Sequence, residues 1–112
     1  MKLVTAIIKP GAMESVKSAL HEIGVKGMTV SDASGFGRQK GQTEVYRGAE
    51  YVVNLIPKVR LEVIVHSNEL EAVLNAIVKG ANTGSIGDGK IWVTPIEEVV
   101  RVRTGERGEA AI

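Results

Sequence analysis

The chain has 112 residues, of which 44% are apolar and 24% charged, and its formal net charge is +1. This length is typical of a single globular domain, and the near-neutral charge gives no general attraction to nucleic acid or anionic lipid. The absence of cysteine excludes disulfides and thiol catalysis. No segment has the pattern of a signal peptide or approaches the ~20 apolar residues of a membrane span, so we expect a cytoplasmic protein.

The first third of the chain predicts a strand, a helix and a second strand. Residues 2–9 are rich in Val and Ile and end before Pro10, which is typical of a strand. Apolar residues then recur at the three- and four-residue spacing of a helix, at Met13, Val16, Leu20 and Ile23. Gly24 is expected to end this helix. Residues 27–36 return to strand character, with Met28 and Val30 on one face.

Residues 37–54 carry no periodic apolar pattern. Gly, Arg, Gln, Lys, Thr and Glu dominate this segment, and Tyr46 and Tyr51 are embedded in it. A loop of this length is unusual in so small a domain and is more often functional than accidental. We therefore expect a functional loop at about residues 37–55.

The second half of the chain repeats the order of the first. A half-buried strand is predicted where apolar and polar residues alternate, at Val59, Leu61, Val63 and Val65. Asn68 has the spacing from Glu71 of a helix N-cap and its capping-box partner. The buried stripe of that helix is expected at Leu70, Val73, Leu74, Ile77 and Val78. Gly80 is expected to end the helix.

The last third predicts a glycine-rich turn over residues 82–89, a strand over residues 90–93 and a further strand over residues 99–103. Two βαβ halves in series predict a ferredoxin-like α/β sandwich of the α+β class, with an antiparallel sheet and both helices on one face. The other face of the sheet would stay open, so we expect the chain to oligomerise.

One short run, Gly87-Asp88-Gly89-Lys90, predicts an anion site. Two glycines let backbone N–H groups face an anion closely, and Lys90 adds a charge. Arg101 and Arg103 would project from the same strand face, roughly 7 Å apart. Each motif alone is also read as an ordinary turn or a solvated strand face. Together they favour a bound polyphosphate, although neither a Walker A loop nor a Rossmann fingerprint is present.

Catalytic constellations are scarce, which favours a binding protein over an enzyme. His21 and His66 are expected at the surface, and no nucleophile–base pair or zinc cluster is evident. A ferredoxin-like RNA binder is a further alternative. It would need aromatic residues that stack bases on the sheet and usually a basic surface, and this chain offers neither.

Four segments resemble signature segments of the PII signal-transduction proteins, and the resemblance covers essentially the whole chain. The segments are residues 35–41, 46–51, 83–93 and 101–106. The resemblance implies one PII-type domain over residues 1–112 with a ferredoxin-like fold, assembled as a homotrimer. It also implies that ATP or ADP binds in the clefts between subunits. By the same resemblance, 2-oxoglutarate would be held by a Mg²⁺ ion that the ATP phosphates help to coordinate.

The resemblance also implies a role for individual residues. The phosphates would lie against the second loop, about residues 82–90, and the C-terminal segment, about residues 101–112, through Gly87, Asp88, Gly89, Lys90, Arg101 and Arg103. Thr29, Glu62 and Ile64 would surround the adenine and ribose. Arg38 would also reach the phosphates, Gln39 would ligate the metal and Lys58 would pair with 2-oxoglutarate. The backbone that completes this site would be Gly35, Gly37, Lys40 and Gly41.

The long loop would control partners, as it does in this family. These are the ammonium channel, at the inner face of the membrane, and enzymes or regulators of nitrogen metabolism. Arg47 would enter a channel mouth, and Tyr51 would be uridylylated or adenylylated by a nucleotidyltransferase. The alternative is a slow ATP-hydrolysing enzyme or an adenylate-only sensor on the same scaffold. Gly11, Asn82 and Ser85 depart from residues common in the family. They bear on partner choice, and Gly11 and Ser85 do not favour binding to an acetylglutamate kinase.

Overall fold

The computed structural model describes residues 1–37, 43–46, 49–52 and 55–112, with only the backbone given at 43–46 and 49–52. Two α-helices are present, α1 (Met13–Glu22) and α2 (Leu70–Ala81). The strands in chain order are β1 (Lys2–Ile8), β2 (Thr29–Gly35), β3 (Thr43–Tyr46), β4 (Ala49–Val52), β5 (Ile56–Val65) and β6 (Gly89–Pro95). Short 3₁₀ turns occupy Pro10–Ala12, Ser67–Glu69 and Gly108–Ala111.

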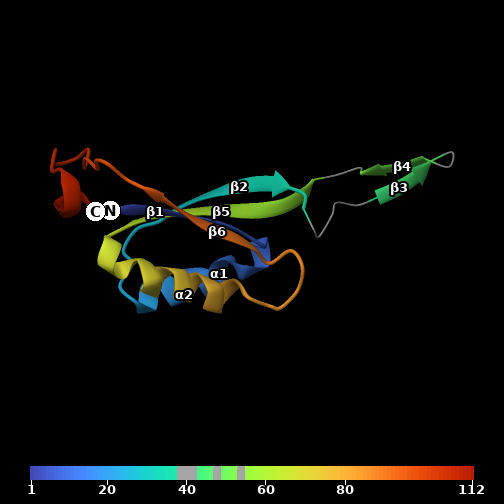
Figure 1. Cartoon of the computed structure of the whole chain (residues 1–112), viewed down its shortest axis with the longest axis horizontal. Helices are drawn as coiled ribbons and strands as arrows, with labels where there is room; N and C mark the ends of the chain where they lie inside the picture. The colour runs from blue at the N-terminus through green and yellow to red at the C-terminus, as the bar shows by residue number, and fades with distance from the viewer. Residues whose placement is uncertain (38–42, 47–48, 53–54) are drawn as a thin grey trace.

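Four strands form one antiparallel sheet in the order β2-β5-β1-β6, and both helices cover the same face of it (Figure 1). The predicted ferredoxin-like βαββαβ sandwich is therefore confirmed. The central strand β1 pairs Val4 with Val63 of β5 and with Val93 of β6. This register places the alternating apolar residues of neighbouring strands on the same face of the sheet.

The hydrophobic core lies between the sheet and the helices. From the sheet it takes the inward members of each alternating run, Val4, Ala6, Ile8, Val59, Leu61, Val63 and Val65. From the helices it takes Val16, Leu20, Val73, Ala76, Ile77 and Ala81. Most of the predicted stripes are thus buried, but Ile23 and Val78, at 46% and 49% exposed, lie outside the core. On the opposite face of the sheet, Ile64 and Trp92 stay 38% and 44% exposed.

Gly80 does not end its helix, contrary to the sequence-based expectation. Helix α2 continues to Ala81, and a Cβ atom added at Gly80 would lie 2.8 Å from the Cα of Val16 in α1. The glycine is present because two helix backbones approach each other closely there. A local sequence pattern cannot distinguish that contact from a helix stop.

Three other local expectations were wrong. Asn68 lies inside the 3₁₀ turn, and the N-cap of α2 is Glu69, which makes no capping side-chain hydrogen bond. The segment expected as one irregular loop contains an antiparallel hairpin of β3 and β4, whose Tyr46 pairs with Ala49. Residues 99–103 do not form a strand. They contain only an isolated bridge, from Val100 to Arg107, followed by a turn.

Candidate functional site

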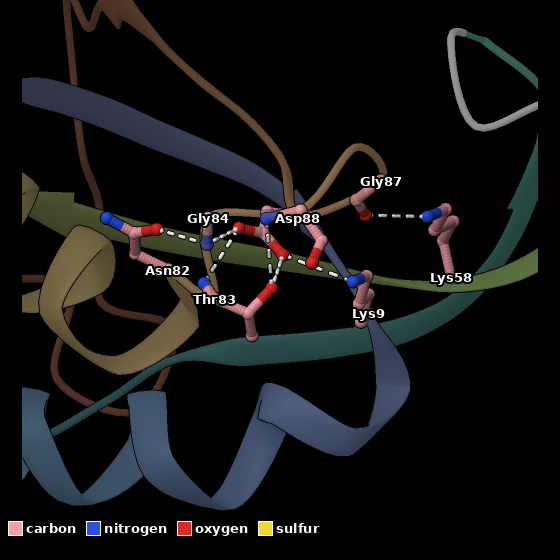
Figure 2. A network of polar contacts seen from close by, with 8 residues as sticks. Lys9, Lys58, Asn82, Thr83, Gly84, Gly87 and Asp88 are labelled. Atoms are coloured by element: carbon pink, nitrogen blue, oxygen red, sulfur yellow. Dashed lines mark hydrogen bonds and ion pairs between the residues drawn. The ribbon is translucent and has the colours of Figure 1, made fainter.

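The glycine-rich loop before β6 is held together by the carboxylate of Asp88 (Figure 2). The Oδ2 atom of Asp88 accepts hydrogen bonds from the backbone N–H groups of Thr83, at 2.7 Å, and Gly84, at 3.0 Å. Its Oδ1 atom accepts a short hydrogen bond from the hydroxyl of Thr83. The same atom lies 3.2 Å from the Nζ of Lys9, which follows the end of β1. The N–H of Gly84 also donates a hydrogen bond to the side-chain oxygen of Asn82.

These contacts favour the charged form of Asp88. The hydroxyl and then the backbone N–H of Thr83 lower the pKa of the carboxyl well below its usual range. Desolvation opposes them, and Lys9 and the N–H of Gly84 lower the pKa further by smaller amounts. Asp88 is therefore ionised at every physiological pH. Because both of its oxygens already have partners, this carboxylate is not available as a ligand for a metal ion.

Glycine is required where the loop meets the sheet. Gly87 and Gly89 have φ angles of +103° and +113°, a region that favours glycine. A Cβ atom at Gly89 would lie 1.7 Å from the carbonyl oxygen of Ile7 in β1. The missing side chains leave backbone N–H groups accessible to an anion, as in other phosphate-binding loops.

Lys58 joins the loop from β5. Its Nζ donates a 2.8 Å hydrogen bond to the carbonyl oxygen of Gly87 (Figure 2). Around this contact lies a hollow of about 600 Å³, here called the loop-end hollow. It combines predicted site residues with apolar ones, and its lining includes Gly35, Gly37, Lys58, Gly87, Asp88, Gly89, Lys90, Ile7, Phe36 and Trp92. Two lysines, exposed backbone donors and an apolar wall suit an anionic ligand with an apolar portion.

A second set of predicted residues lines another hollow, of about 880 Å³. This terminus-end hollow is lined by Thr29, Glu62 and Ile64 together with the C-terminal residues Ala111 and Ile112. It lies toward the sheet end that carries both chain termini, whereas the glycine-rich loop and the β3–β4 hairpin lie at the other end (Figure 1). Within one chain, the glycine-rich loop and the predicted adenine-binding residues therefore belong to two separate hollows.

Arg101 lies with the second set, at the terminus end. Its guanidinium contacts the carboxylate of Glu106 at 2.7 Å and the carbonyl oxygens of Ala110 and Ile112 at 3.2 and 3.4 Å. Its backbone closes the turn, because the N–H of Gly105 bonds to the carbonyl of Arg101 at 2.7 Å. Arg103 is exposed in the same turn. The expectation that both arginines share a strand face is wrong, since the C-terminal turn replaces the strand.

The separation of Arg101 from Lys90 can be followed along β6. In the register with β1, Lys90 pairs with Ile7 and Pro95 pairs with Lys2. Lys90 and Pro95 are therefore roughly 17 Å apart at the usual rise of a strand. Arg101 follows Pro95 along the chain and contacts the C-terminal residues. One copy of the chain therefore does not bring the two arginines to its own glycine-rich loop.

Several residues fall outside this description or were missed. Arg38, Gln39, Lys40, Gly41 and Arg47 lie outside the described residues, and Tyr51 lies in β4, where only the backbone is given. Within the described ranges, no group of three metal-ligating side chains gathers and no helix is long and apolar enough to cross a membrane. Sequence analysis missed Lys9 and Thr83. No role was assigned to either, although Thr83 begins one of the signature segments, because their contact with Asp88 is formed only by folding.

The fold is that of a small α+β protein of the ferredoxin-like type, with a glycine-rich loop before the edge strand β6. The family model "Nitrogen regulatory protein P-II" matches residues 1–106, and the chain belongs to this family. It is 61% identical to nitrogen regulatory protein P-II of Azospirillum brasilense and 54% identical to the nitrogen regulatory protein GlnK of Escherichia coli, each over the full length of both chains. These relatives are regulators, so the chain is a regulatory protein rather than an enzyme.

The fold is also that of a solved structure, Arabidopsis thaliana PII bound to citrate. The TM-score is 0.82 at 45% sequence identity, with 99% of this chain and 91% of that chain covered. Thus the family resemblance that the sequence motifs carried is confirmed across nearly the whole chain.

Proposed function

We propose that this protein is a homotrimeric sensor that binds ATP or ADP and, with Mg²⁺, 2-oxoglutarate, and that it regulates nitrogen metabolism through the segment around β3 and β4. The single observation that carries the proposal is the placement of two complementary half-sites at opposite ends of one sheet. The loop-end hollow offers lysines and backbone donors for phosphates. The terminus-end hollow offers Thr29, Glu62 and Ile64 for a nucleoside.

The half-sites become one site when two copies meet. The loop-end hollow of one copy would then face the terminus-end hollow of the next, with Arg101 and Arg103 of the second copy added to Lys90 of the first. The open sheet face, where Ile64 and Trp92 are exposed, supports such an association because apolar area is left to bury. Three copies are expected from the family.

The residues present fit an anionic ligand. Gly87 and Gly89 leave space for phosphate oxygens, and Lys58 and Lys90 supply positive charge beside them. When bound, Mg²⁺ would neutralise adjacent anionic groups of the triphosphate and the 2-oxo acid. By the family resemblance, Gln39 would be the protein ligand of the ion, and the oxygens of Asp88 are already engaged within the loop. Lys58 would exchange its contact with Gly87 for a carboxylate of 2-oxoglutarate.

The ligands would act on partners through the segment around β3 and β4. This segment follows Gly35 and Gly37, which line the loop-end hollow, so ligand contacts there would bias its conformation. The expected partners are an ammonium channel, a nucleotidyltransferase that modifies Tyr51, and enzymes or regulators of nitrogen metabolism. Membrane contact would occur only through the channel, and the protein would otherwise be cytoplasmic.

The test is calorimetric titration of 2-oxoglutarate into the protein with Mg²⁺ and ATP, and then with ADP in place of ATP. Binding that requires both Mg²⁺ and ATP is the expected result, because the γ-phosphate helps to hold the metal. Nucleotide binding without any response to 2-oxoglutarate would leave an adenylate-only sensor. Absence of nucleotide binding would overturn the proposal, and release of phosphate would favour the slow ATPase.

A further inference from the structure

Asp88 presents an electrostatic problem for a phosphate-binding loop. It stands between Gly87 and Gly89, so a fixed negative charge lies within the segment that would receive a polyphosphate. Like charges at such range repel, and the repulsion is strong where solvent is partly excluded. The side chain of Asp88 is only 20% exposed. A loop of this kind therefore binds anions well only if the carboxylate is neutralised and turned away from the ligand.

The structure supplies both conditions. The two oxygens of Asp88 are directed back into the loop, onto the N–H and hydroxyl of Thr83 and the N–H of Gly84 (Figure 2). Lys9 places its Nζ 3.2 Å from Oδ1, from a side chain that is 30% exposed. Lys9 follows Ile8, which pairs with Gly89, so the end of β1 brings the lysine to the loop.

We propose that Lys9, Asp88 and Thr83 form a charge-neutral frame that fixes the shape of the loop and keeps the Asp88 carboxylate from repelling a bound polyphosphate. The three are positioning residues, and Asp88, which the sequence placed among the ligands, does not contact the nucleotide. The inference rests on the proposed nucleotide binding. It adds that Lys9 acts through Asp88 rather than on the phosphates directly.

The frame predicts an unusual pattern of affinities for ATP and ADP. Lys9→Met should weaken ATP about tenfold, because it leaves an uncompensated carboxylate in the loop. The loss should be smaller for ADP, which carries less charge, and should shrink at high salt. Adding Asp88→Asn to Lys9→Met should restore part of the ATP affinity. A lysine that bound the phosphates directly would weaken ATP as much when Lys9→Met is added to Asp88→Asn as when it is made in the wild type, whereas the frame predicts a much smaller loss in the Asp88→Asn background.

The variants are compared by calorimetric titration of ATP and ADP into the assembled protein at two salt concentrations. Lys17→Met, at an exposed position of α1, removes the same charge away from the loop and should leave both affinities unchanged. Thr83→Ser keeps the hydroxyl and should bind ATP normally, whereas Thr83→Val should not. A double variant no better than Lys9→Met alone would overturn the charge role of the frame.

A second measurement tests the frame without any nucleotide. Amide hydrogen exchange of Thr83 and Gly84 should accelerate in Asp88→Asn and in Lys9→Met, and should be unchanged in Lys17→Met. Unchanged exchange in both loop variants would overturn the frame even if ATP binding fails. If the wild-type protein binds no nucleotide but the exchange responds as expected, the proposed function fails and the frame stands as a structural unit.

Discussion

At the scale of single residues, Gly89 is the described glycine at which an added side chain would meet the closest obstruction. Its φ angle of +113° and the approach of the Ile7 carbonyl to its Cα both exclude a side chain. The constraint applies to the fold and to the proposed binding site, because the same residue begins β6 and lines the loop-end hollow. A substitution there must either displace β1 or distort the loop.

Gly89→Ala is therefore expected to reduce both stability and nucleotide binding. The added Cβ would lie 1.7 Å from the carbonyl oxygen of Ile7, so the loss should exceed the ~1 kcal/mol that a glycine substitution ordinarily involves. Urea unfolding and ATP titration measure the two effects. Gly11→Ala is the matched control, since nothing lies within 4 Å of its added Cβ. Equal stability of the two variants would contradict the close approach.

The ionisation of Asp88 makes the loop sensitive to acid. Because folding lowers the pKa of this carboxyl, its contribution to stability is present above the ordinary Asp pKa of about 4 and is lost as the pH falls below it. The stability difference between wild type and Asp88→Asn should thus be constant near neutral pH and shrink in acid. Urea unfolding of both proteins across pH 7 to about pH 3 measures it. A difference that grew in acid would contradict the assignment.

At the scale of elements, polar contacts hold the C-terminal 3₁₀ turn, Gly108–Ala111, against the end of the sheet that carries both chain termini (Figure 1). Glu109 contacts the imidazole of His66 and lies 3.8 Å from the amino group of Met1, while the N–H of Gly108 bonds to the carbonyl of Val99 at 2.9 Å. The guanidinium of Arg101 also contacts this end of the chain, because it donates hydrogen bonds to the carbonyl oxygens of Ala110 and Ile112. The turn closes one side of the terminus-end hollow.

Glu109→Gln should loosen this turn without unfolding the protein. The Glu109 side chain is 61% exposed, so its ion pairs contribute little to global stability, at most about 1 kcal/mol. Amide exchange of Gly108 should accelerate while the midpoint of urea unfolding changes little. Glu14→Gln, on the exposed side of α1, should change neither. Unchanged exchange at Gly108 would show that backbone bonds alone hold the turn.

The sequence predicted the elements with strong periodicity and missed those set by distant contacts. The alternation in β5 and the three- and four-residue spacing in α2 arise because each element buries one face. The local sequence pattern is therefore enough to predict these two elements. The glycine at position 80 of α2 is explained by the backbone of Val16 in the other helix, and the C-terminal turn includes contacts from Arg101 to distant carbonyls. Likewise, the glycine-rich motif was evident, but its partner Lys9 carries no motif because only the fold brings it near.

At the scale of the whole molecule, the proposed shared site can be tested by mixing subunits. Lys90→Ala and Arg103→Ala should each weaken ATP binding in a uniform trimer. In trimers reassembled from equal amounts of both, about one interface in four would pair an intact Lys90 with an intact Arg103. Calorimetry should then show a fraction of sites with wild-type affinity. No recovery on mixing would mean that both residues act within one chain.

The two half-sites at opposite ends of the sheet also dictate how copies must be joined. Each chain would place its loop end against one neighbour and its terminus end against another, which is a head-to-tail contact. Every half-site then has a partner only if the copies form a closed ring. ATP would then bridge subunits, and its binding energy would add to the cohesion of the ring. Dilution that dissociates the ring would abolish the proposed sensor itself, so the cellular concentration of this protein would set a threshold below which it could not respond to its ligands.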